Sequence, residues 1–201
     1  MIRVFNGQDG EWTATLRSSG KKQFSILIET QLRVQPRALQ ETHLIFPPLK
    51  KDALDFLIEK SVELGVTHLH PVLTQKTVIR DIKPERLKKQ LIEACEQCER
   101  LNIPELSTLA ELEKLLRDWP REKTIYAALE REDAAPLGRK DLDATHAFLI
   151  GPEGGFSEIE KNNLKKLEFV EAVNLGPNIL RAETAALCCL SFALTSRAPS
   201  P

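Results

Sequence analysis

The order of apolar and polar positions divides the chain into two parts. In the first part, apolar and polar residues alternate over short stretches separated by turn dipeptides such as Asn6-Gly7 and Asp9-Gly10. This pattern predicts three β-strands, at 2–5, 11–16 and 24–28. Three short strands bury little apolar surface. We therefore expect residues 1–40 to pack against the rest of the chain or to form part of a small barrel.

After residue 40, short apolar stretches alternate with residues that are apolar at helical spacing. Strands are predicted at 43–46, 66–72, 124–129, 145–150 and 170–175. The first helix is predicted to be capped by Asp52 and to bury Leu54, Leu57, Ile58, Ser61 and Val62. A final apolar helix is predicted over 182–196. The alternation favours an α/β domain over residues 41–201, with a mostly parallel sheet that is covered on both faces.

Capping signals mark the starts of three further helices. Pro84 fits the first turn of one of them. Thr108-x-x-Glu111 and Ser157-x-x-Glu160 both resemble capping boxes, in which two side chains bond reciprocally to backbone N–H groups. The inner face of the helix after Pro84 is predicted to hold Leu87, Leu91, Ala94, Cys95 and Cys98.

The composition limits the class of protein but does not indicate a function. The 201 residues are 42% hydrophobic and 28% charged, which is typical of a globular protein. Net charge is −1; residues 1–40 hold six basic and three acidic residues, or +3, so the remainder is −4. So small a bias does not by itself indicate a nucleic-acid partner. No signal peptide or membrane-spanning stretch is visible, so we expect a cytoplasmic protein.

Cysteines and histidines offer only weak metal signals. Cys95-x-x-Cys98 has the spacing of half a zinc site, but no second Cys/His pair matches it, and small apolar residues on a helix face explain it better. His68 and His70 share one face of a strand without an evident third ligand. We therefore expect no metal.

Two loops are the best candidates for a ligand site, because parallel sheets bind ligands at the carboxyl ends of their strands. The first loop, Gly151-Pro-Glu-Gly-Gly155-Phe-Ser157, has three glycines that allow close backbone approach or positive φ. The second, Leu175-Gly-Pro-Asn-Ile-Leu-Arg-Ala-Glu-Thr-Ala185, leads into the last helix. An ordinary tight turn and a solvated Arg181–Glu183 pair are the plain alternatives. The glycine spacing fits neither a P-loop nor a dinucleotide fingerprint.

These two loops, with the preceding strand Phe148-Leu-Ile150, resemble the paired signatures of the RsmE-type SPOUT methyltransferases. Two further stretches are similar to helices of that family, Glu59-Lys-Ser-Val-Glu-Leu-Gly-Val66 and Glu93-Ala-Cys-Glu-Gln-Cys-Glu-Arg100 with Ile103-Pro104. The resemblance runs from about Leu44 to Leu194. All four stretches occur in the family's order and spacing.

The resemblance implies a fold and an activity. The catalytic domain would be an α/β sheet with a C-terminal trefoil knot, a rare exception to unknotted topology. A partial PUA-like β-barrel over residues 1–40 would grip RNA. The protein would be a homodimer, without a membrane partner. It would methylate uridine N3 in 16S rRNA within the small ribosomal subunit, with S-adenosylmethionine as donor.

The resemblance also implies the site residues. Arg181 would be the essential catalytic group, stabilising negative charge on the base, and Glu183 or Glu153 would accept the proton or position Arg181. No metal would be required. The donor would be held by Ala128, Leu129, Ile150, Gly151, Gly154, Gly155, Leu175, Gly176, Ile179, Leu180, Thr184 and Ala185.

Two departures from the family leave alternatives open. The family begins with further residues before the strand at Ile2, and Thr74-Gln-Lys76 replaces an acid followed by Arg. Ribose 2'-O or guanine N1 methylation by another SPOUT enzyme is one alternative. A non-catalytic RNA-binding or ribosome-assembly factor is another. A generic α/β domain that binds ATP or NAD is a third.

Overall fold

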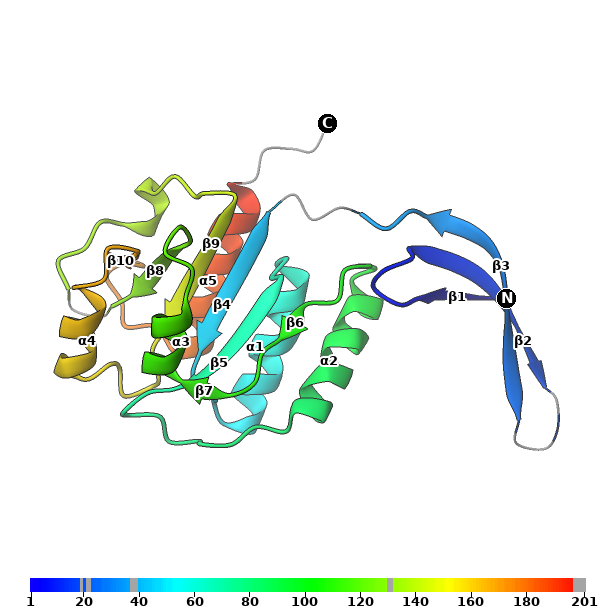
Figure 1. The fold of residues 1–201 in the computed structure, drawn as a ribbon, viewed down its shortest axis with the longest axis horizontal. Helices are drawn as coiled ribbons and strands as arrows, with labels where there is room; N and C mark the ends of the chain where they lie inside the picture. Colours follow the sequence, from blue (N-terminus) through cyan, green and yellow to red (C-terminus); the bar gives the residue numbers. More distant parts are fainter. Residues whose placement is uncertain (19, 21–22, 37–39, 130–131, 197–201) are drawn as a thin grey trace.

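The computed structural model describes residues 1–18, 20, 23–36, 40–129 and 132–196. Within this part of the chain, a small antiparallel sheet extends from an α/β body whose larger sheet has helices on both faces (Figure 1). No described strand of the small sheet pairs with a strand of the larger one.

The small sheet has the strand order β1-β2-β3, all antiparallel. Its strands are β1 (Ile2–Phe5), β2 (Glu11–Ser18) and β3 (Phe24–Arg33). All three predicted strands are present, but β3 continues past Ile28, and a register shift between Trp12 and Ala14 lets the pair bend. Every residue of β3 is exposed, including Phe24 and Ile26.

The larger sheet has the order β10-β8-β9-β4-β5-β6, with β7 also paired to β5, and every pairing in it is parallel. Its strands are β4 (Glu41–Phe46), β5 (His68–Leu73), β6 (Glu105–Leu106), β7 (Ala110–Glu111), β8 (Thr124–Ala128), β9 (Thr145–Ile150) and β10 (Val170–Val173). The predicted parallel α/β sheet is confirmed. The two-residue strands β6 and β7 were not predicted, since they are too short to show a pattern.

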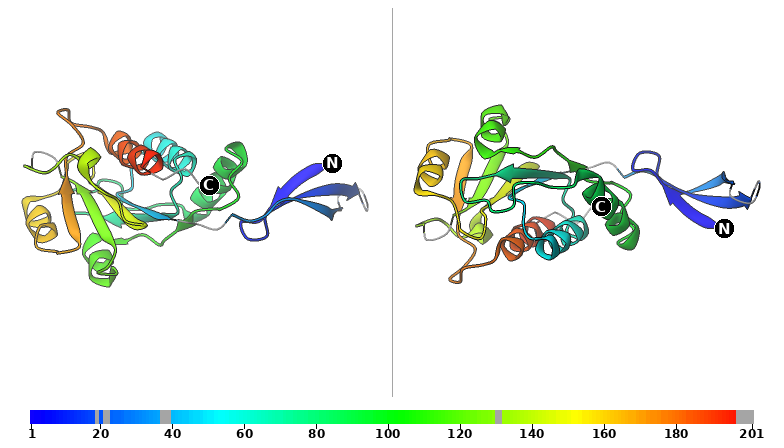
Figure 2. Two further views of the ribbon diagram at one scale, coloured as in Figure 1. Left: turned by 90° about the horizontal axis from the view of Figure 1, so that it is seen from above. Right: turned by 90° about the horizontal axis from the view of Figure 1, so that it is seen from below.

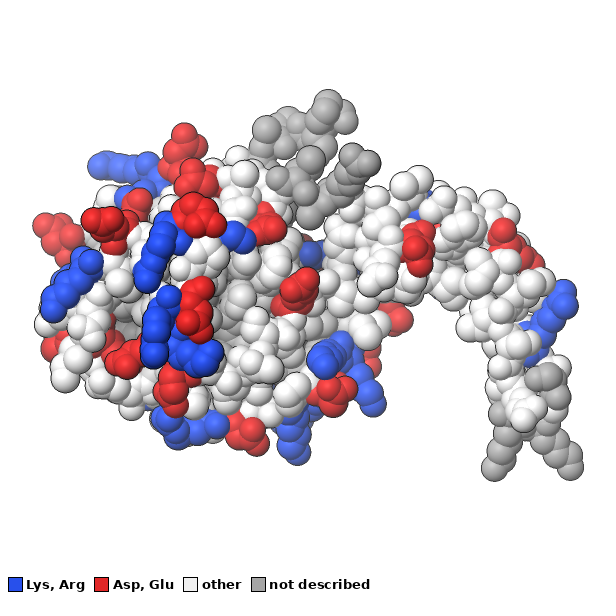
Figure 3. Space-filling view, in the orientation of Figure 1, with Lys and Arg blue, Asp and Glu red and all other residues white. Residues whose placement is uncertain are grey.

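The helices form two layers around this sheet. They are α1 (Lys51–Glu63), α2 (Pro84–Gln97), α3 (Leu112–Asp118), α4 (Glu158–Leu164) and α5 (Ala182–Thr195), with a 3-10 turn at Leu137–Arg139. Helices α1, α2 and α5 lie on one side of the sheet, and α3 lies on the other (Figure 2). Among the described residues, no helix has the length and apolarity needed to cross a membrane. On the face seen in Figure 3, acidic and basic side chains are interspersed over the α/β body.

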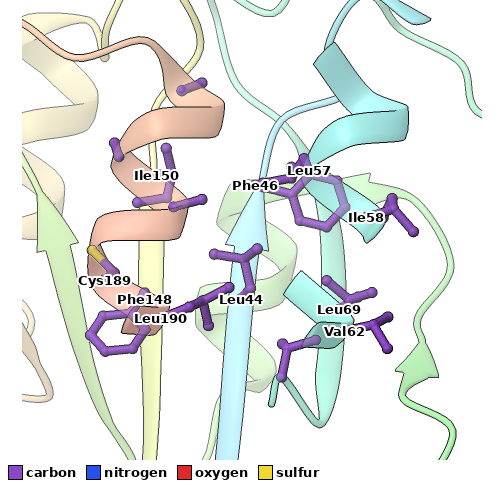
Figure 4. Close-up of a cluster of buried hydrophobic side chains, with 14 of the residues drawn as sticks. Leu44, Phe46, Leu57, Ile58, Val62, Leu69, Phe148, Ile150, Cys189 and Leu190 are labelled. Atoms are coloured by element: carbon purple, nitrogen blue, oxygen red, sulfur yellow. The ribbon is translucent and has the colours of Figure 1, made fainter. Parts of the chain in front are cut away.

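The main core lies between the sheet and the α1–α5 layer. Leu44 and Phe46 of β4 meet Leu57 and Ile58 of α1 there (Figure 4). The residues buried on α1 are the five that were predicted, Leu54, Leu57, Ile58, Ser61 and Val62. A second cluster, which includes Trp119, fills the opposite face. The α1–α5 layer therefore fixes the position of the loops that follow β4 and β9.

The capping predictions have mixed outcomes. Ser157 and Glu160 form the predicted capping box, with both reciprocal hydrogen bonds present, and Pro84 begins α2. Asp52 does not cap α1, because the helix begins one residue earlier and Asp52 lies in its first turn. Thr108 caps nothing either: α3 starts directly after Glu111, which continues from β7 in extended conformation.

Three histidines on β4 and β5 form a stacked cluster on the α3 side of the sheet. The rings of His43 and His68 stack with centroids 4.1 Å apart, and His43 Nδ1 lies 2.9 Å from His70 Nε2. Trp119 meets His43 and His70 edge-on. Within the described part of the chain, no group of three or more His, Cys, Asp or Glu residues could hold a metal ion.

Candidate functional site

A cavity of about 640 Å³ opens at the carboxyl ends of β8, β9 and β10. This size is within the usual range of small-molecule sites. Apolar side chains of Leu129, Ile150 and Leu180 line it together with the glycine loop and the loop after β10. Both loops therefore meet at one cavity, although they are separated by a helix and a strand.

The glycine loop is a tight turn whose shape depends on two glycines. The N–H of Gly155 donates to the carbonyl of Pro152 at 2.8 Å, and Gly155 has φ +65°. A Cβ on Gly151 would lie 3.0 Å from the ring of Phe156, which is buried beneath the loop. A side chain at either position would strain or displace the turn.

Lys76, in the loop after β5, holds the glycine loop from outside. Its Nζ donates to the carbonyls of Gly154 at 3.1 Å and Phe156 at 3.3 Å. The lysine also lines the cavity, so a positive charge stands at the rim of the site.

Glu160 joins the same two loops from α4. One carboxylate oxygen accepts the N–H of Ser157 in the capping box, and the other accepts the N–H of Gln75 at 2.8 Å. The side chain is only 7% exposed. Its two hydrogen bonds satisfy a buried carboxylate that would otherwise be costly to desolvate.

The loop after β10 is fixed by Asn174. Its side-chain Oδ1 accepts the N–H of Gly176, which has φ +119°. Its backbone pairs with the segment after β8, because Leu137 N–H donates to Asn174 O, and Asn174 N–H donates to Ala135 O. The segment 135–137 therefore lies directly alongside the start of this loop.

A charged cluster closes another wall of the cavity. Lys161 of α4 lies 3.5 Å from Glu132 and 3.1 Å from Glu158, and these carboxylates raise the pKa of Lys161. Lys165 also hydrogen-bonds Glu132, and mainly this bond lowers the pKa of Glu132. All of these groups except Lys165 line the cavity. The pairs tie the segment after β8 to α4.

The structure places most of the predicted donor-binding residues at this cavity. Those that line it are Ala128, Leu129, Ile150, Gly151, Gly154, Gly155, Leu175, Gly176, Ile179, Leu180 and Ala185. Thr184 does not. Of the predicted catalytic residues, Glu153 lines the cavity, whereas Arg181 and Glu183 line a separate cleft with Thr184. Their roles stay predictions.

This second cleft lies beside the donor cavity, and the start of α5 is the wall between them. Leu180, Ala182 and Ala185 face the cavity, whereas Arg181, Glu183 and Thr184 face the cleft. Side chains at the start of α5 therefore divide between the cavity and the cleft, because they point from different sides of the same turn. Arg181 and Glu183 form no ion pair with each other, in contrast to the solvated pair considered above.

Sequence reasoning missed several residues that shape the site. Lys76 and Glu160 act across loops, and no local pattern shows a partner 78 or 85 residues away. Asn174 carried a detectable signal, since an Asn two residues before a Gly is typical of a side-chain-stabilised turn. Lys50, Lys51 and Phe56 line the Arg181 cleft, and no sequence pattern connects them with the second loop.

A parallel α/β sheet with a loop-built cavity at its carboxyl edge defines the class of α/β ligand-binding proteins that use backbone groups for recognition. A family model described as an RNA methyltransferase domain matches residues 36–194. The chain belongs to this family of RNA methyltransferases.

Similar proteins agree with this assignment. The chain is 32% identical over 193 residues to ribosomal RNA small subunit methyltransferase E of Rickettsia conorii, covering 94% of this chain and 78% of that protein. The crystal structure of the enzyme of the same name from Neisseria gonorrhoeae, bound to S-adenosyl methionine, is 30% identical with a TM-score of 0.85, covering 96% and 82%. A TrmH/SpoU tRNA modifying enzyme of Aquifex aeolicus, 13% identical with a TM-score of 0.52 over 80% and 76%, shares the fold.

Proposed function

We propose that this protein transfers a methyl group from S-adenosylmethionine to N3 of a uridine in small-subunit (16S) ribosomal RNA. The observation that carries the proposal is that only the start of α5 separates a backbone-lined cavity from a cleft that holds Arg181 and Glu183. The names of the relatives support the donor and the RNA. Such a substrate would place the enzyme in the cytoplasm, where ribosomes assemble.

The residues of the cavity fit the donor. Leu129, Ile150 and Leu180 offer apolar surface for an adenine ring, and the glycine loop lets backbone groups approach closely. Glu153, which forms no ion pair with any described residue, suits a cationic ligand. When bound, S-adenosylmethionine supplies an electrophilic methyl group on a positively charged sulfur.

In this mechanism the protein's residues prepare the acceptor. Glu183 accepts the N3 proton, which leaves negative charge shared by N3 and the two flanking carbonyl oxygens of the base. Arg181, always cationic and in the same cleft, stabilises that charge. With the base extended past the start of α5 to the donor cavity, N3 would then be placed to form the new N–C bond as the donor's S–C bond breaks. The geometry favours Glu183 over Glu153 as the base, since only Glu183 shares the cleft with Arg181.

The remaining architecture is proposed on the same basis. Residues 1–40 would be part of a PUA-like RNA-binding barrel, which their antiparallel sheet supports, and residues 41–201 would be the SPOUT domain. The backbone pairing of Asn174 with Ala135 and Leu137 supports a trefoil knot, because it holds the loop after β10 alongside the segment after β8.

A homodimer is supported by the outer face of α5. After Glu183 this helix carries no charged residue, and Cys188, Ser191 and Leu194 are exposed. A helix that is apolar all round is normally buried. A second copy of the chain is the partner we propose for this face.

Methyl transfer from labelled S-adenosylmethionine to unmodified small ribosomal subunits tests the function, with the modified nucleotide mapped by mass spectrometry. Label on a uridine N3 is the expected result. Label on a ribose oxygen or a guanine would agree with an RNA methyltransferase but would show that uridine N3 is not the target atom. Donor binding without any transfer, to subunits or to naked 16S RNA, would favour a non-catalytic RNA-binding factor.

A further inference from the structure

We propose that Lys50 and Lys51 bind a backbone phosphate of the RNA next to the target nucleotide, and so place its base against Arg181. This inference rests on the proposed function and adds to it a specific contact with the substrate. Lys50 ends the loop between β4 and α1, and Lys51 is the first residue of α1. Both are about 130 residues from Arg181 in sequence, and no local motif connects them with it.

The first observation is the shape of the cleft. It has a volume of about 640 Å³ and is open to solvent, and Lys50, Lys51 and Phe56 form the wall opposite Arg181, Glu183 and Thr184. Phe56 is 45% exposed, which leaves an aromatic ring available to a nucleotide. A nucleotide in this cleft lies across the start of α5 from the donor cavity.

The second observation is that the cations of the cleft have no partner in the described structure. Lys60, Lys88 and Lys123 each pair with a carboxylate, whereas Lys50, Lys51 and Arg181 form no ion pair there. Asp52 and Glu183 also line the cleft, so three positive charges stand against two negative ones. An anion that reaches the lysines displaces no existing ion pair.

The third observation is that the lysines oppose the stability of their own helix. Lys50 is the N-cap of α1 and makes no side-chain cap bond, and Arg181 occupies the same position on α5. A positive charge at a helix N-terminus is unfavourable, and Ser, Thr, Asp or Asn normally caps it. Helix α4 has such a cap in Ser157. Sites that break a local rule are often functional, and a phosphate would remove the electrostatic conflict.

Phosphate binding also gives the lysines a different role from that of Arg181 and Glu183. Contacts to phosphate position a nucleic acid without reading its sequence. With the backbone held at Lys50 and Lys51, the base is free to turn toward Arg181 and Glu183 on the opposite wall. The lysines are therefore positioning residues, and they take no part in proton or methyl transfer.

The test is the salt dependence of RNA binding by the full chain, with Lys50→Gln/Lys51→Gln compared with the wild type and transcribed, unmodified 16S RNA as the probe. The double variant is expected to bind roughly 10-fold more weakly near 0.1 M salt, and the slope of log affinity against log salt is expected to become shallower by about 1 to 2. The KM for RNA should rise, while kcat at saturating RNA and the affinity for S-adenosylmethionine stay unchanged.

A matched control is Lys88→Gln/Lys89→Gln, two adjacent exposed lysines on α2. It removes the same charge away from the cleft and should leave the slope near that of the wild type. The Lys50/Lys51 variant should melt no lower than the wild type, because it removes cations from a helix N-terminus, so weaker binding would not reflect unfolding.

An unchanged slope, or an equal loss in the control variant, overturns the proposal. Binding needs no turnover, so this comparison decides the role of the lysines even if the wild type fails to methylate uridine N3. That failure would instead overturn the proposed function.

Discussion

The carboxylate of Glu160 in α4 accepts the backbone N–H of Gln75, in the loop after β5, at 2.8 Å, although the two residues are 85 positions apart in sequence. The same carboxylate caps α4 through Ser157. Lys76 adds a second link, to the carbonyls of the glycine loop. The donor cavity is therefore held open by neighbouring residues of the β5–α2 loop as well as by its own glycines.

Replacing Glu160 should loosen this link. Glu160→Ala removes a charged acceptor from two partly buried backbone N–H groups, which is expected to cost about 1–3 kcal/mol of unfolding free energy. The affinity for S-adenosylmethionine should fall as well, because the glycine loop is no longer fixed. Chemical denaturation and calorimetric titration measure the two effects. Asn162→Ala, at an exposed position on the same helix that does not line the cavity, is the control and should change either quantity little.

Arg181 should affect catalysis without affecting the fold. Arg181→Ala is expected to lower kcat by roughly 10²–10³-fold, as the loss of a charge-stabilising group does, with donor affinity retained because the side chain faces the other cleft. Arg181→Lys should recover only part of the rate, since an ammonium lacks the planar fork. Single-turnover methylation measures this. Near-normal turnover in Arg181→Ala, matching the exposed control Arg117→Ala, would exclude the catalytic role.

Much of the α/β body could be predicted because local patterns and burial agree there. The buried face of α1 and the strand 145–150 match the prediction, since apolar periodicity directly reflects the layer that each element covers. The capping box at Ser157 also needed only local chemistry. At Asp52 and Thr108 the capping pattern was present, but the chain entered each helix at a different residue, and the entry point depends on tertiary packing.

The site was predicted less completely, because its parts meet only in the folded chain. Glycine-rich loops after strands indicated the cavity, since parallel strands bring their carboxyl ends together. That Arg181 and Thr184 face away from it depends on where α5 begins its first turn. The approach of Lys50 and Phe56 to Arg181 follows from the neighbouring positions of α1 and α5, a relationship that one sequence does not contain.

The histidine cluster should make the fold sensitive to mild acid. Burial, more than the neighbouring histidines, lowers the pKa of His43 to about 3 and that of His70 to about 4, from 6.5. The unfolded chain therefore takes up protons first as the pH falls. Stability is fully present above pH 6.5 and is lost as the pH falls from 6.5 toward 4, by up to about 1.4 kcal/mol per pH unit for each histidine. Urea unfolding between pH 7.5 and about 5 measures this loss.

The comparison that isolates the histidines is the slope of stability against pH. His43→Phe keeps a ring that stacks on His68 but cannot take up a proton, so its slope between pH 6.5 and 5 should be shallower by about one proton. Above pH 7 the slopes of the two proteins should coincide. Equal slopes over the acid range would mean that carboxylates, and not the cluster, control the loss.

The outer face of α5 should decide the oligomeric state. Leu194 is 39% exposed on a helix whose exposed side has no charge after Glu183, so Leu194→Glu places a carboxylate on the face proposed to meet a second copy. Desolvating that charge opposes association, and sedimentation should show a monomer where the wild type is a dimer. Ile159→Glu, at a 63% exposed position on α4, is the matched control and should leave the dimer intact. If methyl transfer falls together with dimerisation while donor binding persists, the partner subunit completes the substrate cleft at Arg181; if transfer survives in the monomer, each chain carries a whole site.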